Sequence, residues 1–393
     1  MAVVKFVFYK EVKMRKYLMA DLFAGCGGFS LGMEKAGFTP WFVNELVPEF
    51  CSTYKFNHKL SEEHYFVGDI RELNSKIENY DKILKSIDIV IGGPPCQGFS
   101  MANRQRIIDD PRNELYKAYL TFLSHVRPKF FVMENVRGMK KRQGEIYEDI
   151  VSYLGNDYQF KSIILQASDF GIPQNRERFI IVGNRIGIQI NDIFYKMSED
   201  MIADGFKLKD ALYGLPHLSP KTEKGVSSLE CEESGFTECD FEYTKNDFYH
   251  FINGNKVIKK LYNHKARYNN PRDIEIFRRL PQGANSLHES IEDIMPYTRR
   301  NGIFKDKYYK LEENNVCKTI TSHMKFDCNS YIHPWEARGL SPREAARIQT
   351  FPDDYFFQGS QNLWYAQIGN AVPVKLAEII GKSIMYFMKG SIT

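Results

Sequence analysis

Short apolar runs alternate with amphipathic segments through the first 185 residues of the chain. Apolar runs bounded by turn residues predict strands, and segments with an apolar residue every three or four positions predict helices. Strands are predicted at residues 17–23, 38–44, 88–91 and 129–133, and helices at 30–36, after Pro48, and at 113–126. Strand, helix and strand at this spacing favour an α/β fold with a parallel sheet covered on both faces.

The pattern changes after Arg185, where the elements become shorter and less periodic. Regular order returns with Ser341, Pro342 and Glu344, which form a capping box with proline at the first helical position. A last amphipathic helix is predicted at residues 374–387. These changes predict two domains, the second inserted late in the first.

The composition is that of an ordinary globular protein. Of the 393 residues, 43% are hydrophobic and 26% are charged, and no apolar run approaches the ~18 residues that span a bilayer. The first ten residues are interrupted by Lys5 and lack a small-residue cleavage site, so they do not resemble a signal peptide. Seven cysteines form no CxxC pair, which favours a reducing cytoplasmic setting and argues against a structural metal site.

A glycine-rich turn, Gly25–Gly28, follows the first predicted strand. Open α/β sheets bind ligands at the carboxyl ends of their strands, and glycines let the backbone approach a ligand closely. Ser30 stands where a dinucleotide-binding motif would have its third glycine, which disfavours a pyrophosphate site. Glu45 ends the second strand and can accept from both ribose hydroxyls, and Asp69 follows the third strand and can accept from an adenine amine. In this order the residues predict an adenosyl pocket.

Cys96 lies in the glycine- and proline-framed segment Gly92–Ser100, directly after the fourth predicted strand. A lone cysteine is more often a small buried apolar residue, but this segment is polar and non-periodic, and its two prolines stiffen the approach to the cysteine. Between residues 101 and 143, ten basic residues outnumber four acidic ones. Such an excess suits a polyanion and favours a thiolate. Cys96 is therefore the candidate nucleophile.

Three charged residues follow on the next elements. Glu134 closes an apolar strand and is expected beside the Cys96 segment, where a desolvated carboxyl can donate a proton. Arg176 and Arg178 precede the apolar run at 179–182, and strand alternation puts both on one face. Two arginines aligned in this way can clamp a phosphate or a base carbonyl. A surface acid and a solvated strand edge are the ordinary alternatives when each is taken alone.

The order of these motifs resembles the cytosine-5 DNA methyltransferase family of bacterial restriction–modification systems. The resemblance runs from about residue 17 to 382 and rests above all on Pro-Pro-Cys-Gln-Gly-Phe-Ser at 94–100 and Glu-Asn-Val at 134–136. It implies a Rossmann-like, S-adenosylmethionine-dependent methyltransferase fold with a mixed, mostly parallel sheet, and a smaller, irregular target-recognition domain. The implied domains are 1–185 with 360–393 for catalysis and cofactor binding, 186–322 for target recognition, and 323–359 as hinge and linking helix.

The chemistry that the resemblance implies agrees with the candidate residues. The cofactor is S-adenosylmethionine, and no metal is needed. The target cytosine is flipped out of the duplex, Cys96 adds to its C6, and C5 then takes the methyl group. Glu134 contacts N3 and the exocyclic amine, Arg178 holds O2, and Arg176 supports the loop and the base. The implied cofactor-binding residues are Phe23, Gly25, Gly27, Gly28, Glu45, Leu46, Asp69, Ile70, Pro95, Leu115, Asn370, Ala371 and Val372.

Charge along the inserted region suggests which part contacts DNA. Residues 192–247 carry 13 acidic and six basic side chains, whereas residues 253–310 carry 13 basic and six acidic ones. Because phosphate contacts supply much of the affinity for DNA, the second stretch is predicted to grip the duplex and the first to face solvent or buttress the domain. The alternative is that the two stretches interleave in space. The predicted DNA-binding residues are Ser100, Arg104, Lys256, Lys259, Arg267, Arg272, Arg299, Arg300, Lys318 and Thr319.

The expected partner is double-stranded DNA, with the chain a monomer in the bacterial cytoplasm, associated with the nucleoid through DNA. The sequence leaves open whether the same system includes a cognate restriction endonuclease, which need not contact this chain. Two alternatives stay open. A branch of the family that methylates tRNA resembles Pro-Pro-Cys-Gln-Pro-Phe-Thr at the nucleophile, whereas this chain has Gly98 and Ser100, and residues 186–322 are more than such an enzyme needs. A catalytically silent DNA-binding relative would lack the nucleophile or the acid, whereas Cys96, Glu134 and Arg178 are all present.

Overall fold

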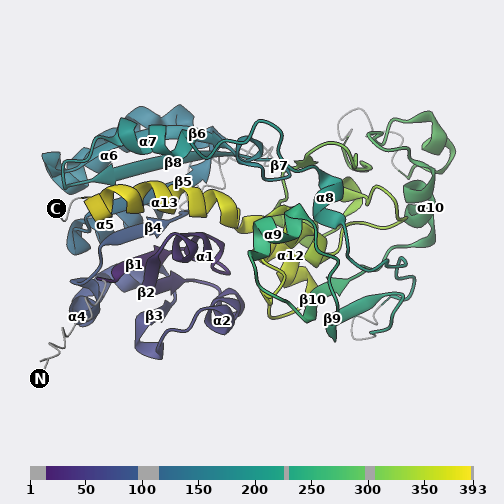
Figure 1. Ribbon diagram of the computed structural model, residues 1–393, viewed down its shortest axis with the longest axis horizontal. Coiled ribbons are helices and arrows are strands. Elements are labelled where there is room, and N and C mark those ends of the chain that lie inside the picture. The colour runs from purple at the N-terminus through teal and green to yellow at the C-terminus, as the bar shows by residue number, and fades with distance from the viewer. Residues whose placement is uncertain (1–14, 96–114, 225–229, 297–305, 391–393) are drawn as a thin grey trace, which may run out of the picture.

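The protein consists of two lobes (Figure 1). The computed structural model describes residues 15–95, 115–224, 230–296 and 306–390. The first lobe is built on one seven-stranded sheet with the strand order β3-β2-β1-β4-β5-β8-β6. Its strands are β1 (Tyr17–Leu22), β2 (Phe38–Glu45), β3 (Tyr65–Val67), β4 (Ile89–Gly92), β5 (Phe130–Val136), β6 (Gln159–Gln166) and β8 (Glu177–Asn184).

The sheet is mixed and mostly parallel, as predicted. Strands β3, β2, β1, β4 and β5 pair in parallel. Strand β8 pairs antiparallel with both β5 and β6, which closes that edge of the sheet. The strands expected from the sequence all form within a few residues of their predicted bounds. Strand β6 was not predicted from the sequence. Most of its residues are half-buried or exposed, so it does not form a continuous apolar run.

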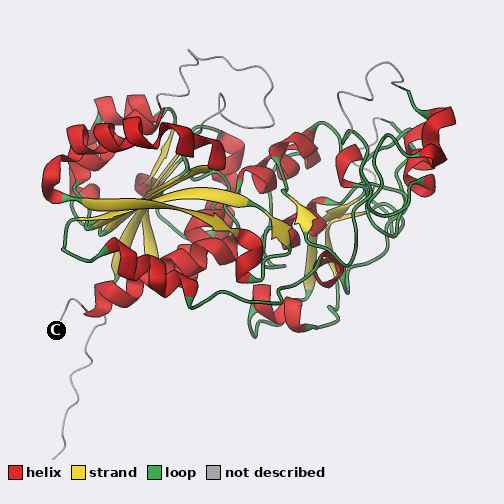
Figure 2. Ribbon diagram, turned by 90° about the horizontal axis from the view of Figure 1, so that it is seen from above, coloured by secondary structure: helices red, strands yellow, loops and turns green. Residues whose placement is uncertain are grey.

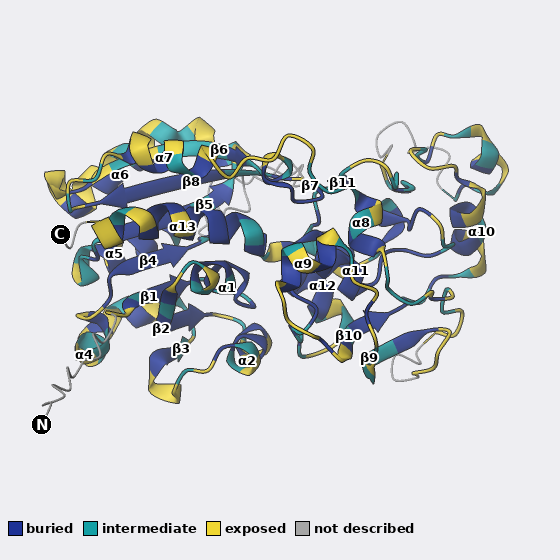
Figure 3. Ribbon diagram, in the orientation of Figure 1, coloured by how far each residue is buried: buried dark blue, intermediate teal, exposed yellow. Residues whose placement is uncertain are grey.

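Alternation along the strands divides the apolar side chains between two cores. In β4, Ile89 and Ile91 belong to one core and Val90 belongs to the other. The first core is covered by α1 (Gly28–Lys35), α7 (Ile190–Ser198) and α13 (Val374–Gly390). The second is covered by α3 (Ile70–Ser75), α4 (Asp81–Leu84), α5 (Leu115–Val126) and α6 (Gln143–Leu154). Helices therefore lie on both faces of the twisted sheet (Figure 2), and the central strands are buried (Figure 3).

The second lobe has short elements and a core of its own. Its helices are α8 (Leu208–Leu212), α9 (Asp247–Asn253), α10 (Pro271–Arg279), α11 (Pro342–Ile348) and α12 (Gln361–Asn370). Strands β9 (Gly235–Asp240) and β10 (Lys260–Lys265) form an antiparallel pair. Strand β7 (Gln174–Asn175) lies in the connection between β6 and β8 and pairs with β11 (Cys317–Lys318), so this small sheet joins the first lobe to the second. Within the described ranges, no helix combines the length and the apolar character needed to cross a bilayer.

The lobes divide the chain differently from the predicted domains. Helix α7 begins after the predicted boundary at 185, yet Ile190, Ile193 and Met197 pack in the core of the first lobe. Residues 323–371 were expected to divide between a hinge and the catalytic domain. Instead, α11 and α12 supply Ile348, Trp364 and other members of the core of the second lobe. The chain returns to the first lobe with α13, whose apolar side chains pack against the sheet in the first core.

Helix α11 is buried on all sides despite carrying charge. The predicted capping box is present, with Ser341 and Glu344 each accepting a backbone N–H from the other. Arg338 pairs with Glu344 at 2.7 Å, and Arg347 pairs with Asp353 at 2.8 Å. A buried charge is tolerated only when it is paired and hydrogen-bonded. These pairs therefore make the region around α11 a polar framework of the second lobe, where the sequence predicted a hinge.

Candidate active site at the carboxyl edge of the sheet

The strand register brings three predicted segments together at one edge of the sheet. Leu22 of β1 lies opposite Gly92 of β4, and Gly92 lies opposite Met133 of β5. These strands are parallel, so the residues that follow them leave the sheet side by side. The glycine turn, the segment that leads into Cys96, and Glu134 are thus neighbours, as the sequence predicted.

The glycine turn is held open by Glu45. The Gly25 backbone N–H donates to Glu45 Oε2 at 2.7 Å, and the Val47 N–H donates to Oε1 at 2.9 Å. Gly25 has a φ of +58°, and a Cβ atom built there would meet no other atom within 4 Å. Burial raises the pKa of the Glu45 carboxyl, and the backbone N–H donors oppose this shift. The turn therefore borders open space and has a carboxylate fixed at its side.

The surroundings of this turn fit an adenosyl group. Leu46 follows Glu45 and is 61% exposed, which offers an apolar surface next to the carboxylate. Phe23 and Leu115 are half-buried at the same edge, whereas the side chain of Ile70 packs in the core. Asp69 accepts from Arg71 at 2.9 Å, and this hydrogen bond lowers the pKa of its carboxyl. An adenine amine at Asp69 would have to share the carboxylate with Arg71.

The other residues predicted for the cofactor lie around this edge. Pro95 is half-buried at the end of the described segment that leads into Cys96. Asn370 is exposed and Ala371 is half-buried at the end of α12. The Val372 carbonyl lies against the start of α1, because a Cβ built on Gly28 would be 2.9 Å from that oxygen. Glycine at position 28 therefore permits this close approach.

Glu134 pairs with Arg178 at the end of β5. Arg178 Nε and Glu134 Oε1 are 2.5 Å apart, and both side chains are nearly buried. A Cβ atom on Gly93 would lie 2.9 Å from Glu134 Oε2, so glycine at this position makes room for the carboxylate. Asn135 donates from Nδ2 to the Pro94 carbonyl at 2.9 Å. The acid and the segment approaching Cys96 are thus fixed to each other.

Arg176 has partners different from those of Arg178. Its buried guanidinium donates to the carbonyl oxygens of Ile320 at 2.7 Å and Ala371 at 2.9 Å, with a longer contact to Gly369. Burial lowers the pKa of Arg176 well below its ordinary value. The two arginines therefore do not form one clamp. Arg178 stands beside Glu134, and Arg176 ties the segment after β7 to the second lobe.

Cys96, Ser100, Arg104, Arg299 and Arg300 lie outside the described residues, so their predicted roles stay predictions. Among the described cysteines, burial raises the pKa of Cys26 and Cys317 to about 12, and that of Cys51 and Cys328 to about 11. A thiol with so high a pKa is a weak nucleophile at neutral pH. These four residues therefore do not compete with Cys96 for the role.

Much of the described part of the basic flank is neutralised by acids from elsewhere in the chain. Lys129 pairs with Asp88 at 2.7 Å, Arg137 pairs with Glu177 at 2.6 Å, and Arg127 pairs with Asp157. Lys140 and Lys141 are exposed. The linear excess of basic residues therefore overstates the positive charge that a polyanion would meet.

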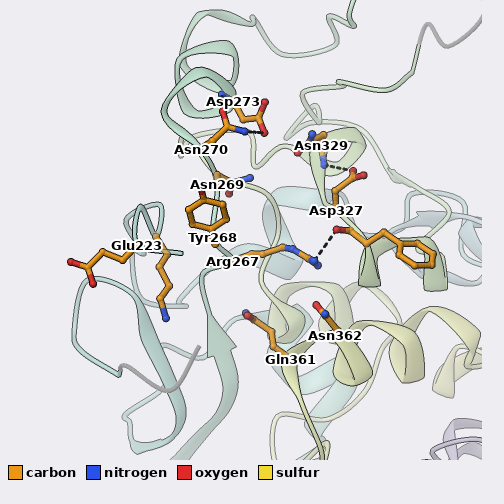
Figure 4. A pocket seen from close by; sticks show the side chains of 12 residues that line it. Glu223, Arg267, Tyr268, Asn269, Asn270, Asp273, Asp327, Asn329, Gln361 and Asn362 are labelled. Carbon is orange, nitrogen blue, oxygen red and sulfur yellow. Dashed lines mark hydrogen bonds between the residues drawn. The ribbon is translucent and has the colours of Figure 1, made fainter. Parts of the chain in front are cut away.

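Several predicted DNA-binding residues are engaged within the protein. Lys256 pairs with Asp354 at 2.8 Å. Arg267 lines a polar hollow of about 300 Å³ in the second lobe and donates to the carbonyls of Met324, Lys325 and Phe326 (Figure 4). Lys259 and Arg272 are exposed. Each of these residues stays a prediction as a DNA contact.

Lys318 and Thr319 lie at the junction between the lobes. The ammonium of Lys318 is 5.2 Å from the centroid of the Tyr331 ring and 5.3 Å from that of Tyr309, and burial lowers its pKa. Thr319 Oγ1 donates to the Asn175 carbonyl at 2.5 Å. Strand β7 with Asn175 leads directly to Arg176 and Arg178, so this hydrogen bond ties Thr319 to the segment that carries both arginines.

The acidic and basic stretches of the inserted region interleave. Strand β9 belongs to the acidic stretch and β10 to the basic one, yet they pair directly. Lys260 pairs with Glu238 at 3.0 Å and with Asp240 at 3.3 Å, and Lys265 pairs with Glu230 at 3.2 Å. Charge along the sequence therefore does not separate two faces in this strand pair, because pairing brings opposite charges into register.

The structure adds residues to which the sequence assigned no role. Asn135 stands between Glu134 and Val136 in a motif singled out for its acid alone. Gln174 accepts from the Ile320 N–H at 2.8 Å and donates to Gln349 at 2.8 Å, next to the contacts of Arg176. The signal for Asn135 was a polar residue in an apolar strand. No local signal could identify Gln349, since its partners lie far away along the chain.

Comparison with known proteins supplies relatives over nearly the whole chain. A sequence model of the family described as C-5 cytosine-specific DNA methylase matches residues 17–386. The chain is 32% identical to the type II methyltransferase M.DdeI of Desulfomicrobium norvegicum, covering 94% of this chain and 88% of that protein. It is 31% identical to M1.HphI of Haemophilus parahaemolyticus, also a type II methyltransferase, covering 93% of this chain and 86% of that protein.

Solved structures share the architecture. A crystal structure described as a DNA modification methyltransferase encoded within a prophage of E. coli matches with a TM-score of 0.71 at 26% identity, covering 95% of this chain and 100% of the other. The S. pombe Dnmt2 methyltransferase matches with a TM-score of 0.54 at 16% identity, covering 95% and 99%. At that identity the second likeness concerns the fold alone.

Proposed function

Because the chain belongs to the C-5 cytosine-specific DNA methylase family, it is an S-adenosylmethionine-dependent DNA cytosine-5 methyltransferase of the restriction–modification type, and we propose that it acts on a flipped-out cytosine in a specific duplex sequence through a covalent Cys96–C6 adduct. The observation that carries the proposal is the Glu134 carboxylate. Arg178 holds it at 2.5 Å, beside the segment that leads directly into Cys96.

In the proposed reaction the Cys96 thiolate adds to C6 of the base. The electron pair of the C5–C6 bond becomes available at C5, and negative charge develops at N3. Glu134 in its protonated form donates its proton to N3 and accepts from the exocyclic amine, which stabilises this charge, and the proton returns to Glu134 when the ring is restored. Arg178 donates to O2 and keeps Glu134 in place. Once C5 carries the methyl group, loss of the C5 proton expels Cys96 and restores the aromatic ring.

The cofactor is proposed to bind at the glycine turn. Glu45 would accept from the ribose hydroxyls with the carboxylate that already receives the Gly25 N–H at 2.7 Å. The exposed Leu46 would lie against the adenine. Bound there, S-adenosylmethionine supplies an activated methyl group at the edge of the sheet that also carries Glu134. The chain's own part is to orient the base toward this edge and to exclude water.

Double-stranded DNA is proposed to lie across the junction of the lobes. Thr319 donates to the carbonyl of Asn175, three residues before Arg178, so the predicted DNA contacts Lys318 and Thr319 are tied to the segment that carries Arg178. We further propose that the chain works as a monomer, which light scattering on the purified protein would test, and that a cognate endonuclease shares its recognition sequence.

Trapping with a fluorinated base tests the mechanism. Bisulfite sequencing of plasmid DNA from a host expressing the chain first identifies the methylated sequence. A duplex carrying 5-fluorocytosine at that position should then form a covalent complex with the wild-type protein, because the C5 fluorine cannot leave as a proton does. Cys96→Ala should lose both trapping and methyl transfer but bind S-adenosylmethionine within about twofold of wild type, since one small side chain outside the adenosyl contacts is removed.

The control for trapping is Cys231→Ala, which alters an exposed cysteine far from the sheet edge and should leave trapping intact. Methyl transfer by Cys96→Ala, or a complex formed through another cysteine, would contradict the mechanism. An assay of tritiated methyl transfer from S-adenosylmethionine compares transfer RNA with duplex DNA as substrates. Methylation of tRNA in preference to DNA would contradict the proposed substrate.

A further inference from the structure

A segment of the second lobe docks behind the glycine turn. This docking segment, Tyr355–Gln358, contacts α2 (Pro48–Asn57) through its backbone. The Phe356 N–H donates to Asn57 Oδ1 at 3.1 Å, and Asn57 Nδ2 donates to the Phe356 carbonyl at 2.9 Å. The Gln358 N–H donates to Thr53 Oγ1 at 2.8 Å. The two lobes are therefore joined at this place by specific hydrogen bonds as well as by apolar contact.

Tyr355 extends from the docking segment to the turn itself. Its hydroxyl donates to the Cys26 carbonyl and lies 3.1 Å from His58 Nε2. The Tyr355 hydroxyl therefore faces both the Cys26 carbonyl and the His58 ring. His58 Nδ1 is in turn 2.7 Å from Glu34 Oε2 on α1. Tyr355 is 3% exposed and the His58 side chain is fully buried, so water does not replace these partners.

The glycine turn packs directly against the side chains of His58 and Tyr355. Gly27 has a φ of +92°, and a Cβ atom on it would lie 2.5 Å from His58 Nε2 and 2.9 Å from Tyr355 Oη. The Cys26 side chain is part of the apolar core of the second lobe. The turn is thus held by two hydrogen bonds: Glu45 accepts from the Gly25 N–H, and Tyr355 donates to the Cys26 carbonyl.

The second lobe holds Tyr355 rigidly. Arg343 donates to the Tyr355 carbonyl at 2.5 Å and to the Pro352 carbonyl at 3.1 Å. Arg347 forms a bidentate pair with Asp353 at 2.8 and 2.9 Å. Both arginines belong to the buried α11. Any displacement of the docking segment would have to break these charge-assisted bonds, which are stronger than neutral ones.

We propose that Tyr355, supported by His58, is a positioning residue for the cofactor, which sets the geometry of the Gly25–Gly28 turn from the second lobe. The inference rests on the proposed binding of S-adenosylmethionine at this turn. It assigns part of the cofactor affinity to a side chain that belongs to the other lobe and contacts the turn at the Cys26 carbonyl, whereas Glu45 contacts it at the Gly25 N–H. A turn shaped in advance binds more tightly because less order is lost on binding.

The test compares two buried tyrosines of the same lobe. Tyr355→Phe removes the hydroxyl at the turn. Tyr365→Phe is the matched control, because Tyr365 is equally buried and donates to the Leu340 carbonyl at 2.7 Å, within the second lobe. Calorimetry with S-adenosylmethionine gives the Kd of each full-length variant, and tritium transfer to unmethylated plasmid DNA gives KM for the cofactor and kcat. Thermal unfolding checks that both variants fold.

Tyr355→Phe is expected to raise Kd and KM for S-adenosylmethionine about 3- to 10-fold, the range of one hydrogen bond, with kcat at saturating cofactor within about twofold. Tyr365→Phe should leave Kd within about twofold even if it melts earlier. Glu34→Ala, which releases His58 from a partly exposed partner, should shift Kd in the same direction by a smaller factor. Equal Kd values for Tyr355→Phe and Tyr365→Phe, or a fall in kcat alone, would overturn the inference. A wild-type protein that does not bind S-adenosylmethionine would instead refute the proposed function.

Discussion

Replacing Gly32 by alanine is expected to destabilise the protein, although alanine is the better helix former. Gly32 lies on the face of α1 that packs against α13. A Cβ atom at this position would be 2.4 Å from Ala377 Cβ, 2.4 Å from the Val374 carbonyl oxygen and 2.6 Å from the Glu378 nitrogen. Ordinary van der Waals contact begins near 3.4 Å. The two helices would therefore have to separate by about 1 Å in a close-packed interior.

The magnitude follows from two opposing effects. Alanine in place of glycine gains about 1 kcal/mol of helix propensity, whereas overpacking a filled interior costs about 1–3 kcal/mol and occasionally more. Three observations put Gly32 at the upper end. The nearest atoms are backbone atoms and a Cβ, which cannot rotate away. The packing is also tight beside it, since a Cβ atom built on Gly28 would lie 2.9 Å from the Val372 carbonyl oxygen, and one built on Gly381 would lie 2.7 Å from Ala36 Cβ. We expect a net loss of about 1–2 kcal/mol in the free energy of unfolding.

Gly144→Ala is the matched control, because it makes the same change in α6 at a position where a Cβ would meet nothing within 4 Å. It should stabilise the protein by up to about 1 kcal/mol. Urea unfolding followed by circular dichroism measures both variants against wild type. Since α1 begins at the cofactor turn, Gly32→Ala should also raise the Kd for S-adenosylmethionine, and Gly144→Ala should not. If both variants shift the urea midpoint in the same direction, the close packing of α1 on α13 does not limit stability as argued.

Three further predictions concern the site itself. Glu134→Gln should slow methyl transfer by about 10²- to 10⁴-fold with DNA affinity little changed, and a rate within twofold of wild type would reduce Glu134 to a structural role. Asn135→Ala removes the donor to the Pro94 carbonyl and should lower kcat about 10-fold while the Kd for S-adenosylmethionine stays within twofold; an unchanged kcat would contradict a positioning role. Burial raises the pKa of the Asp21 carboxyl to about 7, so its contribution to stability is fully present below its unfolded pKa of about 3.9 and is lost as pH rises through 7. Asp21→Asn should therefore flatten the fall of melting temperature between pH 5 and pH 8, and parallel curves for the two proteins would refute this assignment.

The sequence by itself determined the elements of the first lobe and the segments that meet at its edge. Apolar runs of the right length and the turn residues after them are local properties, so β1, β4 and β5 could be located without tertiary information. In a sheet of parallel strands their carboxyl ends share one edge. That rule is sufficient to bring the glycine turn, the segment approaching Cys96, and Glu134 together, as the strand register now shows.

Only the tertiary structure decided the partners that lie far apart along the chain. Arg176 was expected beside Arg178 as a ligand clamp, yet it donates to carbonyls at Ile320 and Ala371. The acidic and basic stretches were separate in sequence, yet β9 and β10 place them side by side. Tyr355 reaches Cys26 across 329 positions. Periodicity encodes which face of an element is buried, but it carries no information about which distant backbone oxygen that face will meet. The docking of the two lobes determines these pairings, because a buried polar group needs a hydrogen-bond partner and the packing decides which distant groups lie within reach.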